Sequence, residues 1–440
     1  MHLTRFQIFR SNFGQLKPLQ KFVLPTSRPG SEDRVLPLLI AGMWAGLLWS
    51  RALLSISMAA FILFAAYLLI REWSVGTRMP DLFRPSLMLL FIVPLVSGFW
   101  SDDRSEWLKA MQVKLPLLLL PIVCPALALM SPIAQKKLFY LLGLMLLISM
   151  SKSLVIYLSN PATYGDAYLK ARVLPVDMSG DHLRLSWLLS AVYAWVLYVL
   201  LHRNTSLRPA DRRALIILAA SIILFLHLLA AKTGILGIYL VSLLAILMHF
   251  RLRAMKWMLL SMVVIPLLAW MLLPTFRNRM KFVRWDFQHY SQGKYREGLS
   301  DAQRVISWRA GMDIWKQAPL TGIGFGDIRA ATLQWHATHR TGMKDHEQIL
   351  PSNQFLVYAA GAGLMGLAVM MLASLVPFLL APYQKYFAWL SFHLLSLMGF
   401  LYENALEGQY GVFIYAFLGS WLWVELSIQG SASEKGLRAY

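Results

Sequence analysis

Charged side chains are scarce in this sequence. They make up 15% of its 440 residues, whereas hydrophobic residues make up 58% and the mean hydropathy is +0.54. Ordinary soluble domains contain about 25% charged and about 45–50% apolar residues. The composition therefore excludes an ordinary soluble globular protein and predicts a chain whose main solvent is lipid.

The sequence contains only one cysteine, and we expect no cleavable signal peptide. The single cysteine, Cys124, lies in an apolar run beside Pro121 and Pro125, so it forms no internal disulfide. The first 34 residues carry six basic side chains but no apolar core of the kind that a signal peptide needs. We expect the first apolar run to act as both signal and anchor.

Acidic residues are few beside the basic ones. The chain has 42 Lys and Arg against 22 Asp and Glu, a formal net charge of +20. The basic residues are scattered between apolar runs rather than gathered in one soluble domain, so we predict no nucleic-acid partner. We expect this charge to meet anionic membrane lipids or an anionic lipid-linked substrate.

Long apolar runs dominate the rest of the sequence. A spanning helix needs about 20 apolar residues, and the runs predict an all-α polytopic membrane protein with about 12 transmembrane helices. Only Trp49, Ser50 and Arg51 separate the first two runs, so a tight re-entrant hairpin is an alternative there. The runs fall at about 35–50, 52–70, 85–100, 114–130, 138–158, 184–201, 213–231, 233–250, 256–273, 352–379, 386–402 and 409–427.

Basic residues are unequally shared between alternate loops. One set, which includes both termini, holds 21 Lys and Arg, and the opposite set holds nine outside the long loop. Because basic loops stay on the cytoplasmic side, we expect both termini to be cytoplasmic. The predicted divisions are a cytoplasmic N-terminal segment (1–34), transmembrane helices 1–9 (35–273), a long outward loop (274–351), transmembrane helices 10–12 (352–427) and a cytoplasmic tail (428–440).

The predicted outward side carries a surplus of positive charge. The 78-residue loop holds twelve basic and seven acidic residues. A solvated domain is one interpretation, and a binding site for an anionic group is the other. Guanidinium groups favour phosphate or pyrophosphate because their planar fork makes bidentate hydrogen bonds.

Three further cations lie near the predicted outer ends of separate spans. Arg184 opens the sixth span, Lys232 lies between the seventh and eighth, and Lys152 lies within the fifth. Snorkelling to the interface would also account for Arg184 and Lys232. Lys152 could instead pair with an acid such as Glu403 or Glu407, which lie before the last span and share one face if that segment is helical.

Residues 301–318 of the loop predict an amphipathic helix that Pro319 ends. Asp301 can cap its start, and Arg304 borders its apolar stripe, whereas Arg309 and Asp313 are spaced to pair in solvent. The stripe consists of Val305, Trp308, Met312 and Trp315.

Alternate glycines follow this helix in the segment Leu320–Asp327, LTGIGFGD. A dinucleotide loop would need a preceding strand, and here a predicted helix precedes. We therefore predict a tight turn that brings the backbone close to the membrane or a ligand.

Taken in order, several motifs resemble the O-antigen ligase and O-antigen polymerase family of polytopic bacterial membrane glycan transferases. The resemblance covers about residues 180–420, and the first five spans match only in hydropathy. The motifs are DHLRLS (181–186), KTGILG (232–237), Arg304-x3-Trp308 running into PLTGIGFGD (319–327), NQFL (353–356) before a glycine-rich span, and LEGQYG (406–411).

The resemblance implies an inverting, metal-independent glycosyltransferase without a cofactor. It would move an oligo- or polysaccharide from an undecaprenyl-pyrophosphate-linked donor to an acceptor hydroxyl, with lipid A-core as the expected lipid-anchored acceptor. It also implies the bacterial inner membrane, with the long loop in the periplasm. Arg184 and Arg304 match family arginines and, with Lys232, would hold the pyrophosphate.

A loop histidine usually activates the acceptor in this family. The family often has His-Asn where the tenth span begins, whereas this chain has Ser352 and Asn353. The expected catalytic residues are therefore His346 or His339, with Arg304. Lys152, Glu403, Glu407 and Asn353 are expected as possible support. The four loop histidines, His289, His336, His339 and His346, show no metal-ligand spacing, so no metal site is predicted.

Two other functions fit part of this pattern. A polymerase that joins lipid-linked repeat units differs from a ligase only in its acceptor. A secondary transporter often has twelve spans, but transporters tend to contain related halves and charges near the bilayer midplane. This chain shows no repeat, and its charges gather at one predicted face, which favours the transferase.

Overall fold

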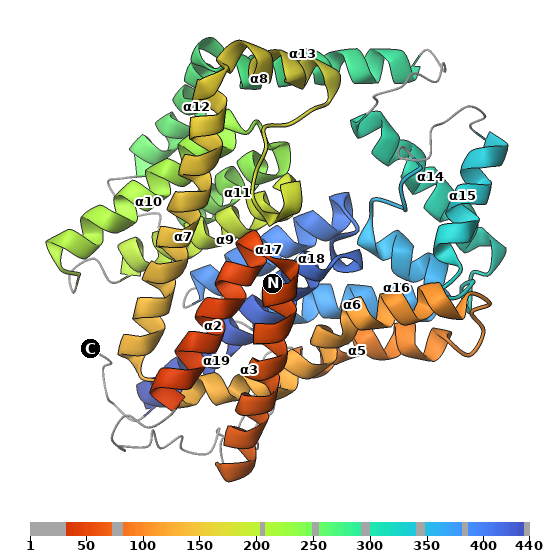
Figure 1. Cartoon of the computed structure of the whole chain (residues 1–440), viewed down its shortest axis with the longest axis horizontal. Helices are drawn as coiled ribbons and strands as arrows, with labels where there is room; N and C mark the ends of the chain where they lie inside the picture. The colour runs from red at the N-terminus through yellow and green to blue at the C-terminus, as the bar shows by residue number, and fades with distance from the viewer. Residues whose placement is uncertain are drawn as a thin grey trace, which may run out of the picture.

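The computed structural model describes residues 32–72, 82–202, 207–248, 255–291, 300–339, 348–380 and 386–434, and no strand occurs among them. Long helices pack beside one another, while α13 (Pro274–Ser291) and α8 (Pro161–Ala167) lie across one end of the bundle (Figure 1). The all-α fold predicted from the sequence is confirmed for these residues.

Each predicted apolar run coincides with a helix. The first nine runs correspond to α2 (Glu32–Trp49), α3 (Arg51–Arg71), α5 (Phe83–Ser97), α6 (Arg104–Val123, continued by the 3-10 turn η1, Cys124–Leu129), α7 (Pro132–Ser159), α9 (His182–His202), α10 (Pro209–Leu228), α11 (Lys232–Met248) and α12 (Met255–Leu272). The last three runs are α16 (Gln354–Leu380), α17 (Phe387–Tyr402) and α18 (Gln409–Phe413), which continues through the π-helix η6 (Ile414–Leu418) into α19 (Gly419–Glu434).

Seven helices in the described part of the chain are long and apolar enough to cross a membrane, and four shorter apolar helices accompany them. The short ones are Arg34–Trp49, Phe83–Ser97, Lys232–Met248 and Phe387–Tyr402. The chain therefore has the character of a polytopic membrane protein, and the count of twelve spans stays a prediction.

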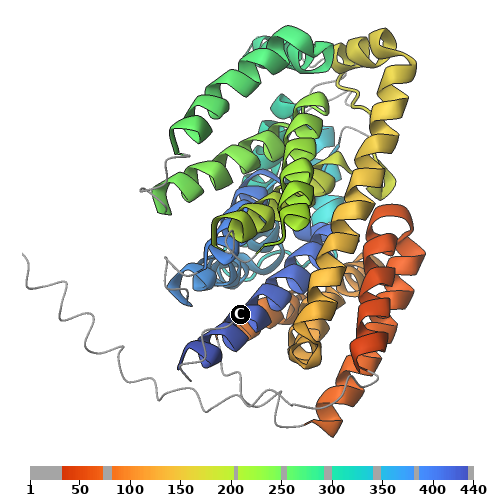
Figure 2. The same cartoon turned by 90° about the vertical axis from the view of Figure 1, so that its left-hand side faces the viewer.

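The first two helices form a tight hairpin along one edge of the molecule (Figure 2). Ser50 ends the turn by accepting a hydrogen bond from the Leu53 nitrogen at 3.3 Å. Gly46 allows the close approach, because a Cβ there would lie 2.3 Å from the Leu54 nitrogen.

Helix α16 is broken where the glycine-rich turn meets it. Ala362 and Gly363 leave helical geometry, and Gly363 has φ +60°. The nitrogens of Ile323 and Gly324 donate to the carbonyls of Ala360 and Gly361, at 2.9 and 3.0 Å. The turn predicted at 320–327 therefore supplies hydrogen bonds to a helix interior, which explains why glycines are needed on both sides.

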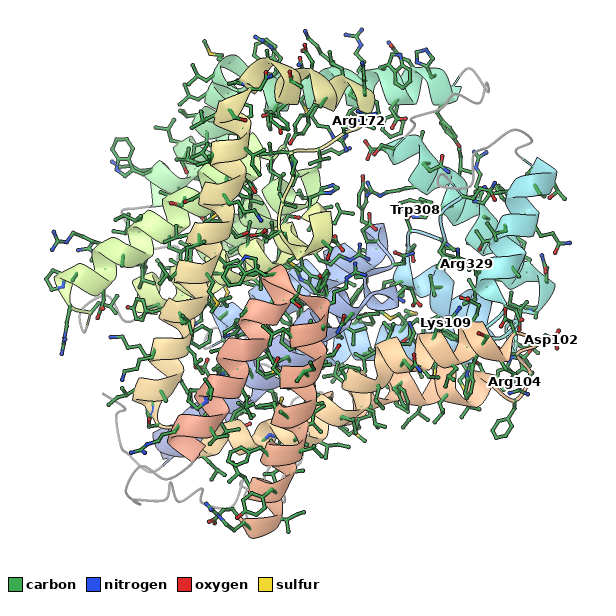
Figure 3. All side chains as sticks on the ribbon, viewed as in Figure 1. Asp102, Arg104, Lys109, Arg172, Trp308 and Arg329 are labelled. Carbon is green, nitrogen blue, oxygen red and sulfur yellow. The ribbon has the colours of Figure 1, made fainter. Side chains whose placement is uncertain are left out.

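The other side of this turn contacts the loop between α5 and α6. The carboxylate of Asp327 accepts hydrogen bonds from the Asp102 and Asp103 nitrogens, each at 2.9 Å. Figure 3 labels Asp102 in this loop and Arg104 at the start of α6, beside the segment that joins α14 (Asp301–Gln317) to α15 (Ile328–His339). The turn thus connects the loop between α5 and α6 to α16 through hydrogen bonds.

Helix α14 forms where the sequence predicts it, but it buries a different face. The predicted stripe is only partly buried, and Met312 is 38% exposed. Asp301 is also not the cap, because it lies inside the first turn and Ser300 holds the capping position. The buried side consists of Asp301, Ala302, Gln303, Ile306, Ser307, Ala310, Gly311 and Ile314.

Candidate functional site

Asp301 connects three helices at the start of α14. Its carboxylate pairs with the ammonium group of Lys232 at the start of α11 and lies 3.3 Å from Nη1 of Arg304. The hydroxyl of Tyr402, the last residue of α17, donates to the same carboxylate at 3.0 Å. Burial raises the pKa of Asp301, but the charge of Lys232 and the hydrogen bonds from Lys232 and Tyr402 outweigh this effect and lower that pKa. Asp301 is therefore a carboxylate at neutral pH.

Arg304 is held in place on two sides. Its guanidinium forms an ion pair with Glu403 and lies over the Tyr402 ring, 4.6 Å from the ring centroid. Burial opposes the positive charge, but Glu403, Tyr402 and Asp301 together outweigh it and raise the pKa of Arg304. The side chain is therefore a fixed cation that is 13% exposed.

Arg184 reaches the same place from α9. Its Nη2 donates to the carbonyl of Asn404 at 3.3 Å, and its Nε lies 3.6 Å from the carboxylate of Asp181. Asn404 directly follows Glu403, the partner of Arg304. The structure therefore brings Arg184, Lys232 and Arg304 together from three helices that are far apart in the sequence.

A pocket enclosing about 470 Å³ lies beside these residues, and we call it the cationic pocket. None of the described residues that line it is acidic, and Asp301 and Glu403 pair with its cations without lining it. Its lining consists of Ala171, Val173, His182, Leu183, Leu229, Ala230, Ala231, Lys232, Thr233, Arg279, Ser300, Arg304 and Tyr402.

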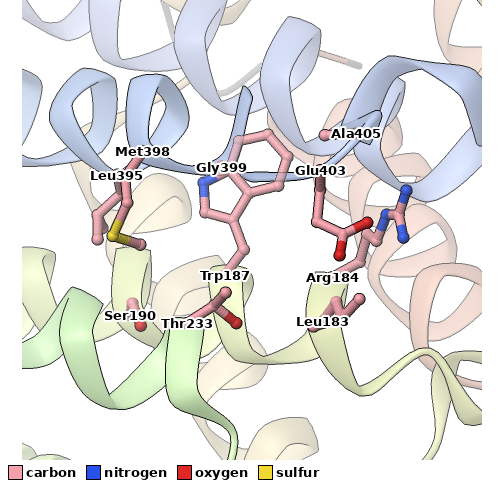
Figure 4. Close-up of a pocket in the computed structure, with 10 residues that line it drawn as sticks. All are labelled: Leu183, Arg184, Trp187, Ser190, Thr233, Leu395, Met398, Gly399, Glu403 and Ala405. Carbon is pink, nitrogen blue, oxygen red and sulfur yellow. The ribbon is translucent and has the colours of Figure 1, made fainter. Parts of the chain in front are cut away.

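A second pocket of about 410 Å³ adjoins the first and shares Leu183 and Thr233 with it. We call it the apolar pocket, since most of its lining is hydrophobic. Figure 4 shows Arg184 and Glu403 side by side at one end of this pocket, with Leu395 and Met398 towards the other. The remaining lining residues are Trp187, Ser190, Gly399 and Ala405.

Sequence reasoning missed two residues of the cationic pocket, His182 and Arg279. His182 lies within the DHLRLS motif, two residues before Arg184. No partner hydrogen-bonds to its imidazole in the described part of the chain. Arg279 lies on α13 and is 6% exposed. Only its burial, which the sequence does not reveal, separates it from the other loop arginines.

Lys152 does not join this site. Its ammonium group lies 2.7 Å from the carboxylate of Asp177, which also accepts a hydrogen bond from the Trp49 indole at 3.0 Å. The expected partners, Glu403 and Glu407, are therefore wrong. Asp177 lies in the connection before α9, where it joins α2 to α7, and the sequence pattern gave no indication of that proximity.

Glu403 and Glu407 lie in different environments rather than on one helical face. Helix α17 ends at Tyr402, so Glu403 is extended and Glu407 lies in the 3-10 turn η5 (Ala405–Glu407). Glu407 accepts from Lys114 at 2.6 Å and from Gln354 at 2.8 Å. Glu403 thus supports Arg304 directly, whereas Glu407 supports the segment that carries Glu403.

Asn353 acts on the backbone and lines neither pocket. Its side-chain oxygen accepts from the Leu356 nitrogen at 3.1 Å, which caps α16, and its amide donates to the Leu401 carbonyl at 2.9 Å. It therefore fixes the start of α16 against the end of α17.

Only one of the two candidate bases, His339 and His346, lies among the described residues. His339 lies at the end of α15, where its ring stacks on Trp335 at 4.6 Å and its Nδ1 contacts the Trp335 carbonyl at 3.0 Å. It lines neither pocket. His346 lies outside the described residues. Within the described ranges, no group of three or more His, Cys, Asp or Glu side chains is arranged to hold a metal ion.

Residues 214–371 match the family model described as O-antigen ligase. The chain carries an O-antigen ligase family domain. No curated protein matches the chain. The resemblance drawn from the motifs is thereby confirmed, and the ligase-family domain includes Lys232, Arg279, Arg304 and Asn353, while Arg184 and Glu403 lie outside the matched residues.

Proposed function

We propose that the protein is a glycosyltransferase of the bacterial inner membrane that moves an oligo- or polysaccharide from undecaprenyl pyrophosphate to an acceptor hydroxyl, with lipid A-core as the acceptor. The O-antigen ligase family domain supports this class of reaction. The observation that carries the proposal is the meeting of Arg184, Lys232 and Arg304 beside two adjoining pockets, one cationic and one apolar.

The two pockets suit the two parts of a lipid-linked donor. A pyrophosphate in the cationic pocket would meet Lys232 and Arg304, whose positions are fixed by Asp301 and Glu403. The apolar pocket would take the adjoining part of the isoprenoid chain, with Arg184 at the junction. Planar guanidinium groups bind phosphate oxygens in bidentate fashion, so the cations would bind and orient the donor.

The reaction is a direct displacement at the anomeric carbon. The acceptor oxygen forms a bond to that carbon, and the bond from the carbon to the pyrophosphate oxygen breaks. The electron pair leaves with undecaprenyl pyrophosphate, and the hydroxyl proton passes to a histidine and then to water. Negative charge grows on the leaving group in the transition state, where the fixed cations stabilise it more than in the ground state.

The base must act on the face opposite the leaving group. His182 lines the cationic pocket with Lys232, Arg279 and Arg304, so it lies on the leaving-group side and is badly placed to take the acceptor proton. We assign the base to His346 ahead of His339, whose ring is held against Trp335. In this proposal the segment 274–351 faces the periplasm and both termini are cytoplasmic.

Lipid analysis of cells that lack the gene tests the proposal, with complementation by the wild type and by Arg304→Ala. A ligase predicts finished polymer that accumulates on undecaprenyl pyrophosphate and is absent from lipid A-core. Single repeats on lipid A-core would instead identify a polymerase. Unchanged glycans together with a lost solute flux would contradict both and indicate a transporter.

A further inference from the structure

Arg279 is a buried cation that its surroundings do not satisfy. Its side chain lines the cationic pocket and the residue is 6% exposed. Its Nη1 is buried without a hydrogen-bond partner, and its Nη2 reaches only Ser300 Oγ, at 3.5 Å. A guanidinium that is removed from water without acceptors is unfavourable, so Arg279 has hydrogen-bond donors available for an anionic ligand in the pocket.

The position of Arg279 is fixed by its neighbours on α13. Thr275 donates to the Leu228 carbonyl at 2.7 Å, and Asn278 donates to the Gly165 carbonyl at 3.0 Å. The guanidinium also lies over the Phe282 ring, 5.4 Å from its centroid. The side chain is therefore presented to the pocket from a helix that is anchored on both sides.

The charge around Arg279 differs from that around the other two pocket cations. Arg304 pairs with Asp301 and Glu403, and Lys232 pairs with Asp301, whereas Arg279 has no ion pair in the described part of the chain. Burial lowers the pKa of Arg279 and the nearby charge of Arg304 adds to this effect, against the opposing charge of Asp301. An arginine remains protonated even so, so Arg279 is a buried cation without an ion-pair partner among the described residues.

A buried arginine can be structural if it forms an ion pair with a nearby acid, and Asp286 is the acid on the same helix. Its carboxylate accepts hydrogen bonds from the backbone nitrogens of Ser300, Asp301 and Ala302, at 3.3, 2.7 and 3.1 Å. It therefore serves the start of α14 and forms no ion pair with Arg279. The charge of Asp286 acts on Arg279 from a distance, but its hydrogen-bonding capacity is used by the backbone of α14.

We propose that Arg279 binds the second phosphate of a diphosphate ligand in the cationic pocket, while Arg304 and Lys232 bind the first. This rests on the proposed function and extends it, because it assigns a residue that distinguishes a diphosphate from a monophosphate. The diphosphate-linked donor would be selected at this point, because a monophosphate carrier has no second phosphate to contact Arg279.

Binding measurements on the full-length protein in lipid nanodiscs test this assignment, with undecaprenyl pyrophosphate and undecaprenyl phosphate as probes. A charge-assisted hydrogen bond lost in Arg279→Gln weakens binding by about tenfold or more. We expect that loss for the pyrophosphate lipid and a change within about twofold for the monophosphate lipid. Arg284→Gln, an exposed arginine on the same helix, is the matched control and should change neither.

A conservative variant covers the case in which Arg279→Gln does not fold. Arg279→Lys keeps the charge but loses the planar fork, so a partial loss confined to the pyrophosphate lipid supports the assignment. Equal effects on both lipids in either variant would overturn it. Failure of the wild type to bind the pyrophosphate lipid would instead refute the proposed donor. Inorganic pyrophosphate is added as a competitor: if it displaces the lipid only at a large excess, the site prefers a lipid-linked diphosphate to a free one.

Discussion

The ammonium group of Lys114 lies 2.6 Å from the carboxylate of Glu407, and no part of the Lys114 side chain is exposed. Lys114 also donates to the Leu406 carbonyl at 3.0 Å, and Gln354 donates to Glu407 at 2.8 Å. This network joins α6 and α16 to the segment that follows Glu403. The position of the carboxylate that holds Arg304 therefore depends on a buried ion pair about three helical turns along α6.

Loss of one member of this pair should destabilise the protein strongly. Lys114→Met leaves Glu407 as a partly buried charge without its cation, which costs about 3–5 kcal/mol. Glu407→Gln in the same chain should recover part of that loss. Lys136→Met, which breaks an exposed pair with Asp211, should cost less than about 1 kcal/mol.

Unfolding free energies in detergent micelles check this prediction, since each variant is compared with the wild type under the same conditions. Equal costs for Lys114→Met and Lys136→Met would show that burial of the Lys114 pair has no energetic consequence. A double variant no more stable than Lys114→Met would show that Glu407 is satisfied by Gln354 and the backbone alone.

The positions of the apolar helices could be predicted from the sequence because lipid imposes a strong and local rule. Each predicted run coincides with a helix, within about seven residues at each end, except that the run at 114–130 begins ten residues inside its helix and ends in a 3-10 turn. The contacts that individual side chains make follow no such rule. Asp313 hydrogen-bonds to Lys316 at 3.0 Å and to Trp335 at 3.1 Å, while Arg309 lies over the Tyr290 ring, so the predicted pair of Arg309 with Asp313 is wrong.

The buried face of α14 shows a second limit of sequence reasoning. Large apolar residues marked one stripe, but the helix packs through small ones, and a Cβ on Gly311 would lie 2.9 Å from a Pro351 side-chain atom. Small residues permit close helix packing, so hydrophobicity alone identifies the wrong side. The convergence of Arg304 with Arg184 was predictable from their similar charge and placement, whereas Arg279 required knowledge of its burial.

Arg304→Ala should lower the rate of glycan transfer by about 100-fold or more, because one preorganised group that stabilises the leaving charge is lost. Arg309→Ala is the matched control, since that arginine is exposed one turn further along the same helix. Transfer is measured in proteoliposomes with lipid-linked donor, and membrane content is compared on blots. Near-normal product from Arg304→Ala would remove this arginine from the mechanism.

The break in α16 predicts that alanine substitutions at two glycines differ strongly in their effect on stability. Gly363 has φ +60°, and a Cβ there would lie 2.3 Å from the Leu320 carbonyl group, so Gly363→Ala should lower folded yield and stability. Gly408→Ala should be tolerated, within about 0.5 kcal/mol, because no atom lies within 4 Å of the added carbon and its φ is −133°. Size-exclusion profiles and thermal unfolding in detergent report both, and a fully stable Gly363→Ala protein would argue against the broken helix.

Substitution of each loop histidine tests which of them is the base. His346→Ala should lower transfer by about 100-fold, the lower end of the contribution expected from general base catalysis. His339→Ala should stay within about twofold, since its ring is held against Trp335 outside both pockets. His289→Ala, on α13 with Nδ1 against the Trp285 carbonyl at 2.7 Å, controls for loss of an imidazole elsewhere in the same segment. Large loss from His339→Ala with none from His346→Ala would reverse the assignment and require α15 to approach the cationic pocket during the reaction.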